Sequence, residues 1–375
     1  MAELTNISLA RGAPSIDIIA VDELRAAADR AFQRDPSGAF SYGTSAGYPR
    51  LLAWIAEKHG VEPESTIATN GSMQADAFLF KALVEPGDVV VVEAPTYDRT
   101  LLALRQMGAE VLPVPLEADG IDVEALAREL EGGARPKLAH IIPNFQNPAG
   151  CTLSLDKRRR LLELAREYGF IIFEDDPYIE LRLEGAQHPT MLSMAGDETV
   201  VYASSFSKTV CPGIRVGYLV GSADLIARIR RIATGTYISP SMVSQSIVAE
   251  FCASGAIERS IATVKRALLE RRDATCAALE RHLPEARFVK PQGGYFLWVD
   301  LPEGTDIARL EAGARERGVI FVKGSDFLID GGQSSVRLAY SAVPPEQIEE
   351  GIARLADAYR EQEGAPAVAD LGRRA

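Results

Sequence analysis

The sequence has few cysteines and few histidines, four of each among 375 residues. The cysteines lie far apart and form no Cys-x-x-Cys pair, which argues against a disulfide framework or a zinc site and fits reduced thiols in a cytoplasmic protein. No two histidines have His-Glu-x-x-His spacing, and none has an evident partner for a nucleophile triad. We therefore expect no metal site and four structural histidines, His59, His140, His188 and His282.

Long apolar runs are also absent. No stretch approaches membrane-spanning length, and residues 1–6 lack the basic start and the apolar core of a signal peptide. The formal net charge is −12, so a surface built for nucleic acid is not expected. The basic run Lys157-Arg158-Arg159-Arg160 lies within a helical apolar pattern, and we interpret it as a solvated helix face.

Between about residue 65 and residue 220, short apolar runs alternate with longer helix-period segments. This alternation is typical of βαβ units and predicts an α/β fold with a mostly parallel sheet flanked by helices. The predicted strands are Asp88–Val92, Leu138–Ile142, Phe170–Phe173, Val200–Ala203 and Val216–Val220, and the predicted helices are Met73–Val84, Tyr97–Met107, Ile121–Leu130 and Ser154–Tyr168.

The rest of the chain has a different pattern. Residues 222–280 are mainly helical, and residues 281–363 alternate strands and helices as a smaller α+β domain. We expect a large domain over 41–280, and residues 1–40 to form an arm and part of the small domain, with the helix Val21–Arg34 packed there. The tail over 364–375 is rich in Ala, Pro and Gly, and its composition predicts disorder. Within 281–363, strands are predicted at Arg287–Lys290, Gly294–Asp300, Val319–Lys323 and Ser335–Ala339, and helices at Ile307–Arg317 and Pro345–Glu361.

A lysine follows one of the predicted strands, in the run Ser204-Ser205-Phe206-Ser207-Lys208, and Arg215 comes shortly after it. A partly desolvated lysine near fixed positive charge can condense with an aldehyde, and hydroxyls with an arginine can hold a phosphate. Pyridoxal 5′-phosphate carries both groups. The alternative is a surface lysine in a serine-rich loop.

Other predicted strands also end in polar or aromatic side chains, which should meet at one edge of the sheet. A protonated pyridine nitrogen needs a buried carboxylate, for which we predict Asp175, with Asp176 as the alternative. Tyr97 can form an aromatic wall, and Asn147 and Tyr178 can donate to the phenolic oxygen. The expected phosphate site combines Ser205, Ser207 and Arg215 with amide groups of the turn Asn70-Gly71-Ser72-Met73 at a helix start.

At this point the chain resembles the fold-type I pyridoxal-phosphate enzymes, and within them the class I/II aminotransferases of the 2-aminoadipate, kynurenine and aromatic amino-acid group. The resemblance covers nearly the whole chain. It rests on Tyr42-x-x-x-x-Gly47-Tyr48, Gly71-Ser72-x-Gln74-Ala75, Asn147-Pro148-x-Gly150, Asp175-x-x-Tyr178, Ser205-x-x-Lys208 with Arg215, Pro291-Gln292-Gly293-Gly294-Tyr295-Phe296, and Arg337.

The resemblance implies that Lys208 is the catalytic residue, which binds the cofactor covalently and moves the substrate's α-proton. Arg337 would bind the substrate α-carboxylate, and Gly12 and Asn147 would also contact substrate. Tyr42 would reach the cofactor phosphate of a neighbouring subunit, which implies a homodimer. Three positions depart from the family pattern: Ala149 replaces a threonine, Met73 replaces a glutamine, and Arg11 replaces a glycine near the substrate entrance, where it would favour acidic side chains.

We therefore predict an L-amino acid:2-oxo acid aminotransferase that works by a ping-pong mechanism, with 2-oxoglutarate as a plausible acceptor. The expected partners are small-molecule substrates, without nucleic acid or membrane. The alternatives are another pyridoxal-phosphate reaction on the same fold (β-lyase, racemase, decarboxylase or cyclase), a regulatory sensor, and a cofactor-free homologue. The sensor is disfavoured because such relatives carry an amino-terminal helix-turn-helix domain and only a short segment precedes Tyr42.

Overall fold

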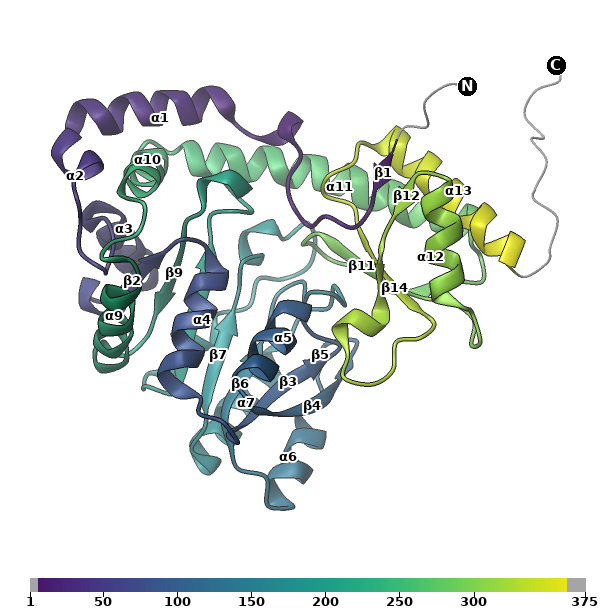
Figure 1. The fold of residues 1–375 in the computed structure, drawn as a ribbon, viewed down its shortest axis with the longest axis horizontal. Coiled ribbons are helices and arrows are strands. Elements are labelled where there is room, and N and C mark those ends of the chain that lie inside the picture. The colour runs from purple at the N-terminus through teal and green to yellow at the C-terminus, as the bar shows by residue number, and fades with distance from the viewer. Residues whose placement is uncertain (1–5, 363–375) are drawn as a thin grey trace.

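The computed structural model describes residues 6–362, which form a large helix-flanked sheet beside a smaller antiparallel one (Figure 1). The large sheet has the strand order β2-β9-β8-β7-β6-β3-β4-β5, and its central strands β4, β3, β6, β7 and β8 run parallel. The predicted α/β fold is thereby confirmed. Its strands are β2 (Thr66–Thr69), β3 (Val89–Ala94), β4 (Glu110–Glu117), β5 (Gly120–Ile121), β6 (Pro136–Ile141), β7 (Ile171–Asp175), β8 (Val200–Ser205) and β9 (Gly217–Val220).

Three of these strands, β2, β4 and β5, escaped prediction, and β5 has only two residues. Strand β4 carries Pro113 and Pro115, and prolines disfavour an interior strand because they cannot donate to the ladder. The missing hydrogen bonds of these prolines are tolerable because β4 lies near the edge of the sheet, where its neighbour β5 pairs only with Leu116 and Glu117. Strand β2 has only four residues and threonine at both ends, so it shows no clear apolar run.

Helices cover both faces of the large sheet. Apolar side chains of α4, α5 and α9 pack on one face, and those of α6, α7 and α8 pack on the other. This arrangement leaves the carboxyl ends of the parallel strands open at one edge. The helices are α2 (Pro36–Phe40), α3 (Pro49–His59), α4 (Ser72–Leu83), α5 (Asp98–Gln106), α6 (Val123–Glu131), α7 (Leu155–Tyr168), α8 (Met191–Ala195), α9 (Ala223–Tyr237) and α10 (Met242–Ala253).

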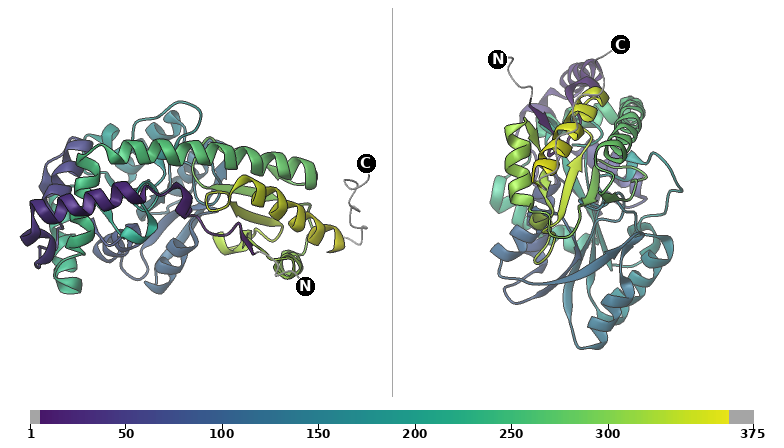
Figure 2. Two further views of the ribbon diagram at one scale, coloured as in Figure 1. Left: turned by 90° about the horizontal axis from the view of Figure 1, so that it is seen from above. Right: turned by 90° about the vertical axis from the view of Figure 1, so that its right-hand side faces the viewer.

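A long helix, α11 (Ala256–His282), runs from the large sheet to the smaller one (Figure 2). Helix α1 (Val21–Arg34) packs on α10, and its Glu23 lies 2.9 Å from Arg259 of α11. The predicted packing of α1 in the small domain is therefore wrong. Its apolar positions, such as Leu24 and Ala27, belong instead to a core shared with α3, α10 and the strands β8 and β9.

The smaller sheet has the order β10-β11-β14-β13 and is antiparallel throughout. The strand predicted over 319–323 is interrupted, because Phe321 turns into the core between β12 and β13. Strand β1 (Ile7–Ser8) pairs with β12, which brings the amino-terminal segment beside this sheet. The elements are β10 (Arg287–Phe288), β11 (Phe296–Asp300), β12 (Val319–Ile320), β13 (Val322–Lys323), β14 (Ser335–Ala339), α12 (Ile307–Glu316) and α13 (Pro345–Gln362).

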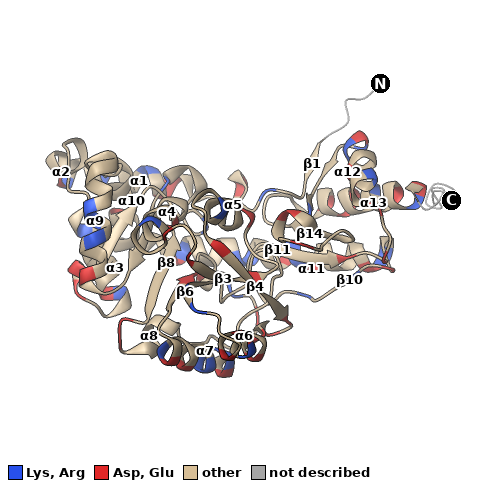
Figure 3. Ribbon diagram, turned by 60° about the horizontal axis from the view of Figure 1, so that its bottom comes forward, with Lys and Arg blue, Asp and Glu red and all other residues tan. Residues whose placement is uncertain are grey.

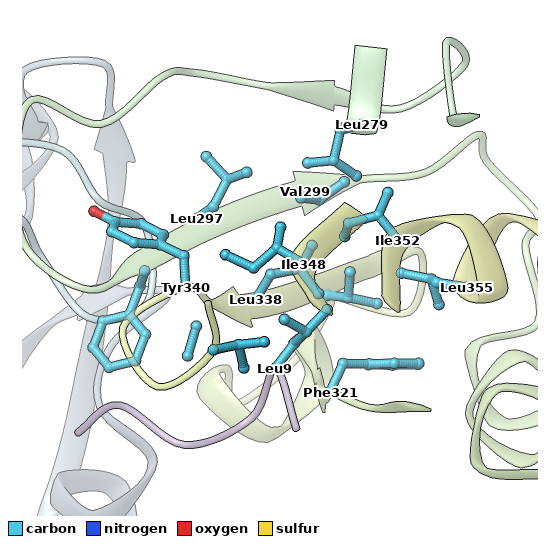
Figure 4. Close-up of a cluster of buried hydrophobic side chains, with 14 of the residues drawn as sticks. Leu9, Leu279, Leu297, Val299, Phe321, Leu338, Tyr340, Ile348, Ile352 and Leu355 are labelled. Atoms are coloured by element: carbon cyan, nitrogen blue, oxygen red, sulfur yellow. The ribbon is translucent and has the colours of Figure 1, made fainter. Parts of the chain in front are cut away.

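A dense apolar core joins the smaller sheet to α13, α11 and the amino-terminal segment (Figure 4). Leu9 from the amino-terminal segment and Leu338 from β14 are both fully buried in it. The predicted domain limits at 40/41 and 280/281 stay a prediction, and the predicted tail over 364–375 lies outside the described residues. No helix in the described range 6–362 is both long and apolar enough to cross a membrane.

The basic run at the start of α7 is only partly a solvated face. Charged residues of both signs line the outside of α6 and α7 (Figure 3), and Arg159 is exposed among them. Arg158, by contrast, is fully buried and donates hydrogen bonds to Leu153 O and to Asn144 Oδ1, both at 3.0 Å. The prediction was wrong for Arg158 because its position in the helix faces the sheet.

Candidate active site

A cavity of about 550 Å³ lies where the carboxyl ends of the parallel strands face the smaller sheet and the amino-terminal segment. It brings together residues that are far apart in the sequence. Of the site residues predicted from sequence, the cavity is lined by Gly12, Ser72, Tyr97, Asn147, Asp175, Tyr178, Lys208 and Arg337.

Lys208 follows β8 and lines this cavity. Its Nζ donates a hydrogen bond to Gly12 O at 2.6 Å and lies 5.6 Å from the centre of the Tyr178 ring. Burial, together with the positive charges of Arg337 and Arg215, lowers the pKa of Lys208 to about 8. A substantial fraction of the amine is therefore neutral near physiological pH, which nucleophilic attack requires.

Asp175, the last residue of β7, points into the cavity, and its Oδ1 is buried without a hydrogen-bond partner. Its Oδ2 lies 3.4 Å from Nε2 of His140, which is fully buried. Asp176 faces the opposite side of the sheet, where its Oδ2 accepts a hydrogen bond from Asn144 Nδ2 at 2.8 Å. Of the two alternatives, only Asp175 is therefore placed to meet a ligand in the cavity.

Hydroxyl groups and an arginine gather beside the start of α4. Ser205 Oγ donates to Ser207 Oγ at 2.9 Å, and Arg215 Nη1 donates to the same Ser207 oxygen at 3.3 Å. Arg215 has a left-handed backbone with φ of 51°, and its Nη2 donates to Asn70 O, just before α4 begins at Ser72. This cluster combines a cation, two hydroxyls and a helix amino terminus, a set of groups suited to a phosphate.

Arg337 on β14 lines the cavity from the side of the smaller sheet. Nη1 donates to Asn147 Oδ1 at 3.0 Å, and Nη2 donates to Ala10 O at 2.7 Å. The guanidinium lies between two aromatic rings, 4.4 Å from the centre of Phe296 and 4.7 Å from that of Phe327. Burial lowers its pKa from the ordinary value without threatening its charge, and its Nε has no partner.

Two tyrosines complete the side walls. Burial raises the pKa of Tyr97 to about 12 and also raises that of Tyr178, so both phenols stay protonated and can donate hydrogen bonds. Asn147 can donate as well through its Nδ2 amide, since its Oδ1 accepts the hydrogen bond from Arg337.

Some of the predicted residues lie outside the cavity. The Met73 side chain is half exposed, which leaves only its backbone amide at the start of α4 for the expected role. Tyr42 is 85% exposed and lies near Met242 in a separate depression. Its predicted contact with a neighbouring subunit stays a prediction. Ser205, Ser207 and Arg215 do not line the cavity themselves but adjoin it at Ser72.

Sequence reasoning missed several residues of the site. Phe296 belongs to one of the family motifs, but the sequence suggested no role for it. The structure shows why residue 12 is a glycine: a Cβ at this position would lie 2.3 Å from the Phe296 ring. Asp326 and Phe327 come from a short turn between β13 and β14 that has no distinctive pattern. His140 was expected to be structural only, and no motif marks its position beside Asp175.

The family model "Aminotransferase class I and II" matches residues 5–355 of the chain. Aromatic-amino-acid aminotransferase 1 of Thermococcus litoralis is 34% identical over 369 residues, covering 95% of this chain and 88% of that protein. The 2-aminoadipate transaminase of Thermus thermophilus is 35% identical over 359 residues, covering 94% of this chain and 90% of that protein.

Solved structures agree with these similarities. The crystal structure of an α-aminoadipate aminotransferase from Thermus thermophilus superposes with a TM-score of 0.91 at 34% sequence identity. The match covers 96% of this chain and 93% of that one, and that protein was crystallised with N-(5′-phosphopyridoxyl)-L-leucine.

Proposed function

Because the chain belongs to the class I and II aminotransferases, which depend on pyridoxal 5′-phosphate, we propose that Lys208 holds this cofactor in the cavity and Arg337 holds the amino-acid substrate. One observation supports the assignment most directly: a lysine of lowered pKa lines the same cavity as two groups that each keep a buried, unpartnered polar atom, Asp175 Oδ1 and Arg337 Nε. Because unpaired buried polar atoms are costly, these two atoms are suited to receive ligand atoms.

The remaining cavity residues fit the cofactor's other groups. Asp175 would accept a hydrogen bond from the ring nitrogen and favour its protonated form, because a carboxylate stabilises a nearby cation. Ser205, Ser207, Arg215 and the first amides of α4 would hold the phosphate. Asn147 and Tyr178 would donate to the phenolic oxygen, and Tyr97 would flank the ring.

When bound, pyridoxal 5′-phosphate supplies an electron sink for the charge left on the substrate α-carbon. Arg337 orients the substrate by pairing with its α-carboxylate through two parallel hydrogen bonds. Lys208 Nζ takes the proton from the α-carbon, and with a pKa of about 8 it can both accept and return a proton near neutral pH. Tyr97, Phe296 and Phe327 shield the site from bulk water.

We propose a ping-pong reaction in which an L-amino acid donor leaves as its 2-oxo acid before the acceptor, 2-oxoglutarate, enters the same cavity. Relatives named for aromatic amino acids and for 2-aminoadipate point to aromatic or acidic donors. Arg337 would then bind the α-carboxylate of donor and acceptor in turn.

The test is a donor screen with purified protein, pyridoxal 5′-phosphate and 2-oxoglutarate, in which donor, oxo acids and glutamate are all quantified. We expect glutamate to appear one for one with loss of the donor. Consumption of donor without consumption of 2-oxoglutarate would instead assign a lyase, racemase, decarboxylase or cyclase activity. Lys208→Ala is the matched inactive control.

The active unit is proposed to be a homodimer in which Tyr42 completes the partner's site. The supporting observation is the depression beside this residue, where the apolar side chains of Phe40 and Val243 are exposed. Mixing Lys208→Ala and Tyr42→Ala subunits should restore about one quarter of the wild-type activity, because half of the dimers then contain one intact site. Activity that is merely the average of the two variants would contradict this arrangement.

We also propose a cytoplasmic location, which the four free cysteines support because a reducing compartment preserves thiols. Cell fractionation tests the location directly. Recovery of the protein with an extracytoplasmic marker would contradict it.

A further inference from the structure

Arg11 contributes a positive charge to the cavity that the proposed function does not use. Its side chain is exposed and lines the cavity, and no hydrogen bond or ion pair is found for it within the described part of the chain. Of the other three cations that line the cavity, Lys208 and Arg337 serve the cofactor and the α-carboxylate. Arg99 already lies 3.5 Å from Asp98.

The backbone of Arg11 is held in place on both sides. Ala10 O accepts a hydrogen bond from Arg337 at 2.7 Å, and Gly12 O accepts one from Lys208 at 2.6 Å. Further back, Leu9 O accepts from the Ala339 amide at 2.6 Å, which fixes the segment to β14. Arg11 therefore projects from a fixed point between the groups proposed for the substrate's α-carboxylate and α-carbon.

A substrate whose α-carboxylate is on Arg337 and whose α-carbon is near Lys208 therefore lies beside residue 11. The Arg11 side chain is long enough to reach a group at the end of the substrate side chain. Of the acids that line the cavity, Asp98 lies beside Arg99 and Asp175 beside His140. Asp326 is exposed and forms no ion pair with Arg11 among the described contacts. A long, unpaired guanidinium in such a place suits a second carboxylate.

We propose that Arg11 is a specificity-determining residue that binds the distal carboxylate of acidic substrates. The proposal rests on the proposed function and deepens it by naming a substrate class: L-amino acids and 2-oxo acids with a carboxylate at the end of the side chain. Aromatic donors, which carry no distal carboxylate, would bind without help from Arg11. One cavity can then serve both kinds of donor, because an unpaired arginine on the surface can swing aside.

The test compares L-glutamate with L-glutamine, which have the same length but end in a carboxylate and in a neutral carboxamide, respectively. Rates of the donor half-reaction are followed by the cofactor's absorbance in the wild type, Arg11→Gln and Arg309→Gln. Arg309 is an exposed arginine on α12 outside the cavity, so its variant controls for the loss of one charge. We expect Arg11→Gln to lower kcat/KM for glutamate about 10- to 100-fold, the effect of one charge-assisted hydrogen bond, and to change it less than threefold for glutamine.

A second readout is independent of turnover. Calorimetry with the cofactor-loaded enzyme measures the affinity for glutarate and for its monoamide, neither of which can react. Arg11→Gln should weaken the binding of glutarate about 10-fold or more and change the affinity for the monoamide by less than about threefold, while Arg309→Gln should alter neither affinity.

The outcomes separate the two proposals. Loss of glutarate affinity in an enzyme that converts no donor supports the role of Arg11 and refutes the aminotransferase assignment of the cavity. Unchanged glutarate affinity and an unchanged glutamate-to-glutamine ratio in Arg11→Gln overturn the role of Arg11 and leave the proposed function intact.

Discussion

Replacing Arg337 by methionine is expected to remove most of the binding energy for the substrate α-carboxylate. Two charge-assisted hydrogen bonds of about 1.5–3 kcal/mol each would be lost, so the transition state should lose about 3–6 kcal/mol of stabilisation and kcat/KM should fall roughly 10²- to 10⁴-fold. Methionine has a similar length and can fill the space between Phe296 and Phe327. The loss of the bond to Asn147 leaves an unpaired amide oxygen, which should cost about 1–3 kcal/mol of folding stability.

The assay compares L-phenylalanine with phenethylamine, which lacks the carboxylate. In the wild type the amino acid should react far faster, whereas in Arg337→Met the two rates should converge. The Arg337→Lys variant keeps the charge without the planar fork, and it should recover only part of the loss. The reasoning is refuted if Arg337→Met still discriminates between the two donors by the wild-type factor.

Two further predictions concern the cofactor end of the cavity. Cofactor capture by the apoprotein requires a neutral Lys208 amine, so the capture rate should rise with pH and level off above about pH 8. In Arg337→Met the midpoint of this pH profile should move to higher pH, because a nearby positive charge is gone. A midpoint unchanged in that variant, or one near 10.5, would contradict the assigned environment. Asp175→Asn should lower the transamination rate about 100-fold or more while the cofactor still binds. Asp176→Asn should lower thermal stability instead, because Asp176 bonds Asn144 on the side of the sheet away from the cavity. Equal kinetic effects of the two variants would argue against Asp175 as the carboxylate that pairs with the cofactor's ring nitrogen.

Much of the fold was predictable because apolar runs and helical periodicity follow directly from burial. The helix Val21–Arg34 and the strand Ser335–Ala339 were predicted with the bounds that the structure gives. The packing of the first of these was not predictable, since an amphipathic helix has a buried face whichever neighbour covers it. Strand β4, with its two prolines, required knowledge of its place near the sheet edge.

The site was predictable where function depends on strand ends. Lys208 and Asn147 follow strands of the parallel sheet and Asp175 is the last residue of one, and the topology brings such ends together. Arg337 and Gly12 come from the smaller sheet and the amino-terminal segment, so only the family resemblance could connect them with the rest.

Residues defined by tertiary neighbours alone were not predictable. His140 is a strand residue like any other until its contact with Asp175 is known. Arg158 looked like one of four surface cations, but the carbonyl groups around it satisfy a buried guanidinium. Neither position carries a local pattern that would distinguish it.

The central claim is that Lys208 is the residue that holds the cofactor. Borohydride reduction of the protein loaded with pyridoxal 5′-phosphate, followed by peptide mapping, tests it most directly. We predict a single phosphopyridoxyl group on the peptide that contains Lys208 and none in Lys208→Ala. Modification of a different lysine, or label retained in Lys208→Ala at the wild-type level, would contradict the account.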